Sequence, residues 1–231
     1  NLSGLSSEDQ RDLERLYRRK IDRDRVSTQP FNRELCVLAR RLGRKISALI
    51  DRSGAVRFVI VGDERLVFMP GLKDRSLRPL TLRGLRLISV HPRHGATAIS
   101  RDDLADLALL RLDLVLKVDI SEDGYPALSH LAHLKPVNPE NEGFEILPPF
   151  PPGRLDIDFQ ELIAALEDEL SRGRVKGQSA GQGGVILVKV VLSRKKGARV
   201  DRWSVENEMA ELKSLARSAG LEVPSTLGPP F

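Results

Sequence analysis

Apolar residues recur at helical spacing in two stretches near the start of the chain. A first helix is predicted after Ser6 or Ser7, with acidic residues in its first turn, where they suit the helix dipole. A second helix is predicted over residues 31–42, and Gly43 follows it as a residue that readily closes helices. The apolar stripes that carry these predictions are Leu13, Leu16 and Tyr17 in the first helix and Phe31, Leu35, Leu38 and Leu42 in the second.

From residue 45 onward the apolar positions alternate or run together over short stretches, which is typical of β-strands. One helix interrupts them, with Ser100 as its N-cap and two aspartates in its first turn. The predicted fold class is therefore α/β, a mixed α+β sheet domain with flanking helices, followed by a partial βαβ unit. Strands are predicted over residues 45–51, 55–62, 64–70, 82–92, 114–120 and 127–134.

The residue composition changes twice in the last third of the chain. Prolines crowd residues 135–153, and a helix is predicted over 158–170, before a glycine-rich stretch that has the composition of a flexible linker. An apolar strand and a helix capped by Ser204 then begin a βαβ unit, which we expect to be incomplete because parallel strands need neighbours. The predicted domains are an N-terminal extension over 1–170, a linker over 171–184 and the start of a second α/β domain over 185–231.

The expected cellular compartment and the charge of the chain limit the classes of function that the sequence allows. The sequence contains no apolar run of about 18 residues and its start lacks signal-peptide features, so we expect a cytoplasmic protein without a membrane span. The single cysteine, Cys36, beside the apolar stripe of the second helix, is interpreted as a core residue. The net charge is +5, and residues 171–204 hold nine lysines and arginines against one acid. Such a segment can contact nucleic-acid phosphates, although a solvated basic linker is the commoner explanation.

The candidate metal-binding residues are concentrated in residues 89–103. Two imidazoles and two carboxylates there could bind a divalent metal if the loop folds them together, and the candidate ligands are His91, His94 and Asp103, with Asp102 adjacent. The spacing of His91, Ser100 and Asp103 resembles the metal motif of the JAMM/MPN metallopeptidases. Ser89 stands where the first histidine of that motif would be, so the resemblance implies a degenerate site. A capped helix after a solvent-facing loop is the plainer interpretation.

Two blocks of sequence resemble the N-terminal part of the HflX family of ribosome-associated GTPases. "DRSGAVRFVIVGD" and "ISRDDLADLALLRLDLV" resemble the extension of its long forms, and "VILVKVVL" with "DRWSVENEMAELKSLARSAGLEV" resembles the start of its N-terminal domain. The resemblance implies binding to the large ribosomal subunit and its RNA, with GTP and magnesium held by a downstream GTPase domain. No G-x-x-x-x-G-K-[ST] motif occurs in these 231 residues, so no GTPase activity is expected from them.

Three functions remain open from the sequence. The first is a non-catalytic module of an HflX-like GTPase, with phosphate contacts from Arg194, Lys195, Lys196, Arg199 and Arg202. The second is a JAMM-like metallohydrolase domain, in degenerate form, with zinc as its cofactor. The third is a domain that senses a small ligand or a protein for the attached GTPase.

Overall fold

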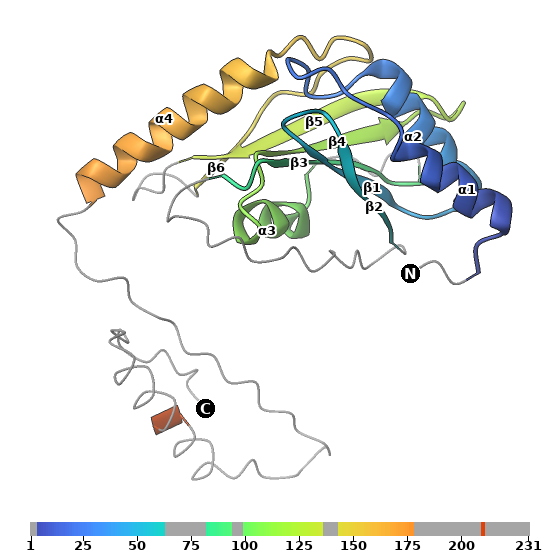
Figure 1. Ribbon diagram of the computed structural model, residues 1–231, viewed down its shortest axis with the longest axis horizontal. Coiled ribbons are helices and arrows are strands. Elements are labelled where there is room, and N and C mark those ends of the chain that lie inside the picture. Colours follow the sequence, from blue (N-terminus) through green and yellow to red (C-terminus); the bar gives the residue numbers. More distant parts are fainter. Residues whose placement is uncertain (1–3, 63–81, 94–98, 136–142, 178–208, 211–231) are drawn as a thin grey trace. The chain divides into compact units, whose positions relative to one another are not determined.

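A six-stranded mixed sheet forms the centre of the N-terminal unit in the computed structural model, which describes residues 4–62, 82–93, 99–135, 143–177 and 209–210 (Figure 1). The strands lie in the order β2-β1-β3-β4-β5-β6; β3 and β4 are parallel, and the other neighbours are antiparallel. The α/β fold class expected from the sequence is confirmed. The strands are β1 (Ile46–Asp51), β2 (Val56–Val61), β3 (Leu85–Val90), β4 (Leu114–Ile120), β5 (Pro126–Leu134) and β6 (Phe144–Ile146).

The helices begin and end where local chemistry satisfies their backbone. Ser6 and Ser100 each close a capping box with the aspartate three residues later, at the starts of the first and third helices. Gly43 ends the second helix in the left-handed conformation, with φ of 60°. The described helices are α1 (Ser7–Leu16), α2 (Gln29–Leu42), α3 (Arg101–Leu109) and α4 (Phe159–Gly177).

The two faces of the sheet are covered unequally (Figure 1). Helices α1, α2 and α4 cover one face and share its large apolar core with alternate residues of the central strands, such as Ile88 and Leu116. Helix α3 covers part of the opposite face, where Leu107 packs with Leu87 and Val115. Because side chains alternate along a strand, one residue of each neighbouring pair belongs to each core.

Several boundaries differ from those expected. Helix α4 continues through Gly177, beyond the end expected near residue 170, and the three-residue strand β6 lies in the proline-rich region. The expected strand over 64–70 and the apolar strand at 185 lie outside the described residues, although Met209 and Ala210 are helical as expected. The chain divides into two compact units, residues 1–176 and 177–231. None of the described helices is long and apolar enough to cross a membrane.

Arg86 is a fully buried arginine in β3, beneath α4. Its guanidinium carbon lies 4.1 Å from the centroid of the Phe159 ring. Its Nε, Nη1 and Nη2 atoms have no hydrogen-bond partner in the described part of the chain. Burial lowers the pKa of Arg86 to about 10, against the opposing attraction of Asp113 and Asp51. The cation–π contact stabilises this charge without satisfying its N–H groups.

We expect Arg86→Met to stabilise the protein by about 1–3 kcal/mol, because methionine fills similar space and removes unsatisfied donors. Urea unfolding of both proteins measures the difference. Arg52→Met is the matched control, because Arg52 donates to both Asp113 and Glu167 and its loss should destabilise the protein. A lower unfolding free energy for Arg86→Met would show that the guanidinium contributes net stability.

Candidate functional site

The candidate site lies at the start of α3, near the carboxyl ends of the parallel strands β3 and β4. Ligand sites in open α/β sheets commonly form beyond the carboxyl ends of such strands. Asp103 is at the third position of α3, with 2% of its surface exposed. Sequence motif and topology therefore point to the same end of the sheet.

The carboxylate of Asp103 is held by four groups of the protein itself. Its Oδ2 atom accepts hydrogen bonds from the Ser100 backbone at 3.0 Å and from the Ser100 hydroxyl at 2.7 Å. Its Oδ1 atom accepts from Lys45 Nζ at 3.1 Å, and Lys117 Nζ lies 3.9 Å from Oδ2. Both carboxylate oxygens are thus engaged in a helix cap and a buried charge cluster.

The charge balance of this cluster keeps Asp103 ionised. Burial opposes ionisation, but the positive charge of Lys45 and the hydrogen bonds from Ser100 and Lys45 together lower the pKa of Asp103 below its ordinary value. The pKa of Asp106, one turn further along α3, is shifted the other way: burial and the Asp103 charge raise it above its ordinary value. The Asp103 carboxylate is a stable anion whose counterions are lysines.

A row of polar side chains crosses the sheet beside this cluster. Ser47 of β1 pairs in register with Ser89 of β3, Ser89 with Lys117 of β4, and Lys117 with His130 of β5. All four face the side of the sheet that α3 covers, because their strand neighbours belong to the opposite core. The α3 side is therefore apolar beneath the helix and polar toward the carboxyl ends of β3 and β4.

Some atoms of this polar region lack partners. The hydroxyls of Ser47 and Ser89 and the Oδ1 atom of Asp119 are buried without a hydrogen bond within the described ranges. The other Asp119 oxygen lies 2.8 Å from Nε2 of His130. Since unsatisfied buried polar atoms are rare, these three mark a place where water or a polar ligand would be stabilised.

The structure places the metal candidates separately. His91 follows β3 and its Nδ1 accepts a hydrogen bond from the backbone of Arg93 at 3.2 Å. His94 lies outside the described residues, whereas Asp103 is engaged as above. Among the residues that the structure describes, no group of three or more His, Cys, Asp or Glu side chains is arranged to hold a metal ion. The basic candidates from Arg194 to Arg202 also lie outside the described part.

The remaining histidines and the cysteine take structural positions. His130 faces Asp119, and His133, on the opposite face of β5, lies 3.6 Å from Glu145. This agrees with the odd spacing of the two histidines in sequence. Cys36 is fully buried in α2, where burial first and the Asp119 charge second raise the pKa of its thiol to about 12. The thiol is therefore poorly suited to nucleophilic chemistry.

Lys45 and Lys117 were not identified as site residues from the sequence. One signal was available for Lys117, because it is the only basic residue within the apolar run "LVLKVDI" of a strand that is buried on both faces. A lysine in such a place requires a counterion. Lys45 carries no comparable signal, since it directly precedes a strand, where exposed lysines are common.

The protein is therefore of the mixed α/β class, and its charge cluster around the buried Asp103 lies at the start of α3, which covers part of one face of the sheet. Comparisons of the chain with protein-family models, with curated proteins and with solved structures find no match. What the protein does is therefore inferred from its own residues and contacts.

Proposed function

We propose that this chain is a non-catalytic N-terminal module of an HflX-like GTPase, which acts in the cytoplasm and contributes to binding of the large ribosomal subunit or regulates that binding. The ribosomal part of the proposal is supported by the two sequence blocks that resemble the family and by the basic segment over residues 171–204. GTP and magnesium would belong to a downstream GTPase domain.

The proposal that the chain is non-catalytic rests on the contacts of the Asp103 carboxylate. A metal ligand must offer a lone pair in an open position, and a catalytic zinc also keeps a coordination position for water. Here the carboxylate oxygens are bound by Ser100 and Lys45, and Lys117 adds a second ammonium group. Two lysine ammonium groups next to a metal ion would repel it, so the cluster favours a structural role over a JAMM-like hydrolase.

RNA binding by the basic segment is tested by the salt dependence of affinity. We expect the full chain to bind purified large ribosomal subunits with an affinity that falls steeply as KCl rises, because counterions are released from phosphates. Replacing five basic residues by alanine should reduce the slope of log affinity against log salt by about 0.7–0.9 for each phosphate that is no longer neutralised. The five replaced residues are Arg194, Lys195, Lys196, Arg199 and Arg202.

A charge-matched variant separates local phosphate binding from net charge. It replaces five exposed arginines of the first unit by glutamine, which removes the same number of positive charges, and it should retain most of the slope. Equal reductions in both variants would overturn the assignment of RNA binding to the basic segment. Stoichiometric zinc in the purified wild-type protein would instead favour the metallohydrolase. The control positions are Arg11, Arg15, Arg18, Arg23 and Arg33.

A further inference from the structure

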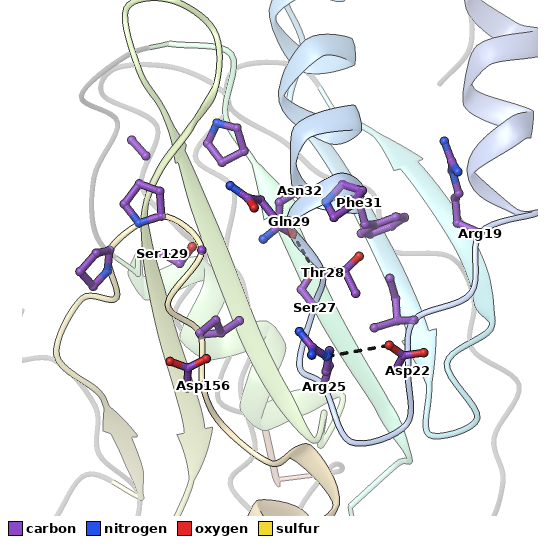
Figure 2. A pocket seen from close by; sticks show the side chains of 18 of the residues that line it. Arg19, Asp22, Arg25, Ser27, Thr28, Gln29, Phe31, Asn32, Ser129 and Asp156 are labelled. Carbon is purple, nitrogen blue, oxygen red and sulfur yellow. Dashed lines mark hydrogen bonds and ion pairs between the residues drawn. The ribbon is translucent and has the colours of Figure 1, made fainter.

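A cavity of about 510 Å³ opens at the start of α2, on the opposite side of the sheet from α3 (Figure 2). Its walls come from the segment over residues 19–32, from the first residues of β5 and from residues 151–156. Pockets of this volume accommodate small organic molecules. The cavity uses neither the Asp103 cluster nor the basic segment proposed for RNA.

The end of α2 inside this cavity presents two backbone donors. The N–H groups of Gln29 and Phe31 have no partner within the helix, whereas Pro30 between them has no N–H and the Asn32 amide donates to the Thr28 carbonyl at 2.9 Å. Thr28 is the N-cap residue, but its side chain makes no capping hydrogen bond, and the first turn contains no acidic residue. The positive end of a 14-residue helix is therefore left without a side-chain acceptor.

Two buried side chains add donors that have no partner. Ser27 donates its hydroxyl to Oδ1 of Asn32 at 2.5 Å, which turns the amide nitrogen of Asn32 away from Ser27. Neither that nitrogen nor the hydroxyl of Ser129 has a hydrogen-bond partner in the described ranges, although Asn32 is 8% exposed and Ser129 is 6% exposed. Figure 2 shows Ser129, from β5, across the cavity from Thr28 and Arg25.

The charged residues of the wall include three cations, of which Arg19 and Arg25 take part in ion pairs. Arg19 is already bound to Glu34 at 2.7 Å. Lys20 and Arg25 are exposed at the opening, and Arg25 makes only a 3.8 Å contact with Asp22. The acidic residues of the wall, Asp22 and Asp156, are exposed to solvent and do not reach the buried donors. The interior thus offers donors, and the rim carries charges of both signs, with Lys20 and Arg25 against Asp22 and Asp156.

We propose that this cavity binds a small organic phosphate, with its phosphate monoester at the start of α2. A phosphate presents several acceptor oxygens and two negative charges, which match the amides of Gln29 and Phe31, the hydroxyls of Thr28 and Ser129, and the ammonium group of Lys20 at the rim. The cavity is much larger than a phosphate ion, so the organic part of the ligand has room beside Leu155 and the neighbouring prolines.

NMR titration of the full chain tests the site directly. At constant ionic strength, we expect inorganic phosphate to cause saturable shifts of the Gln29, Phe31 and Asn32 amide signals, and ribose 5-phosphate to bind about tenfold more tightly than phosphate through its added contacts. Ribose without phosphate should cause no such shifts. Equal binding of ribose and ribose 5-phosphate, or shifts that chloride reproduces, would overturn the proposal.

Thr28→Asp separates loss of the site from loss of the fold. Aspartate at the N-cap can accept the Phe31 amide and places a negative charge at the start of α2, so this variant should raise the melting temperature and abolish the phosphate shifts. Ser129→Ala should weaken phosphate binding about tenfold, as expected for one hydrogen bond to a charged group, whereas the exposed Ser171→Ala should leave it unchanged. If Thr28→Asp binds phosphate as tightly as the wild type, the start of α2 is not the site.

Discussion

Asp103→Ala is expected to destabilise the protein by about 3–5 kcal/mol, because it removes the buried carboxylate that the partly buried Lys45 and the buried Lys117 share. Urea unfolding measures the loss. Asp9→Ala is the matched control: Asp9 closes the same type of capping box with Ser6, but at the surface, where its other partner is Arg41. Its loss should cost about 1 kcal/mol, as expected for a cap and an exposed ion pair.

A second substitution shows whether Lys45 causes the difference. Adding Lys45→Met to Asp103→Ala should restore part of the lost stability, since the double variant also removes the ammonium group that has lost its hydrogen bond to Asp103. If Asp9→Ala and Asp103→Ala cost the same, the cluster contributes only a helix cap.

The dependence of the unfolding free energy on pH below neutrality should also show the contribution of the Asp103 carboxylate. The pKa of Asp103 is lowered in the folded state, so its ionised form contributes stability above the unfolded pKa of about 4. That contribution is lost as pH falls through the lower folded pKa. The difference in stability between wild type and Asp103→Asn should therefore shrink below about pH 4.

Gly54→Ala is expected to destabilise the protein by more than about 3 kcal/mol, through both backbone strain and overlap. Gly54 has a φ of 88° in the turn between β1 and β2, and a Cβ atom there would lie 1.8 Å from the backbone oxygen of Ile21. The Ile21 amide donates to the Gly54 carbonyl at 2.9 Å, so the two segments cannot separate without losing that bond.

Gly43→Ala gives the matched control for this prediction. Gly43 also has a positive φ, of 60°, but nothing lies within 4 Å of the position that its Cβ would take. The substitution should cost only the left-handed strain, about 1–2 kcal/mol. Thermal or urea unfolding of both variants compares them. Equal costs would show that the contact between the turn and Ile21 adjusts freely.

Local patterns predicted the elements of the first unit well. The capped starts of α1 and α3 and the stop at Gly43 depend on interactions between residues close in sequence, and strands β1 to β5 have apolar patterns of strand length, so spacing and residue type indicate them. The end of α4 was less predictable. Its last turns contain glycines and basic residues, whose composition favours a linker, yet the helix continues through Gly177.

The candidate site was predictable only in part. Sequence identified Ser100 as an N-cap with two aspartates in the first turn and drew attention to Ser89, but it did not predict that Lys45 would donate to Asp103 from 58 positions away. Nor did it predict the row from Ser47 to His130, because register between strands is set by pairings that no local pattern contains. The α2 cavity depends likewise on three distant segments.

The sequence by itself indicated most helices and strands of the first unit, the serines that cap α1 and α3 and the side chains that are apolar, because these properties follow from short-range geometry. Tertiary structure alone decided the strand order β2-β1-β3-β4-β5-β6, which places α3 on one face and three helices on the other. It also decided that Asp9 and Asp103, alike in their local motifs, differ in burial and partners. Burial is a property of the assembled chain, and it makes the same carboxylate an ordinary cap in α1 and the centre of a charge cluster in α3.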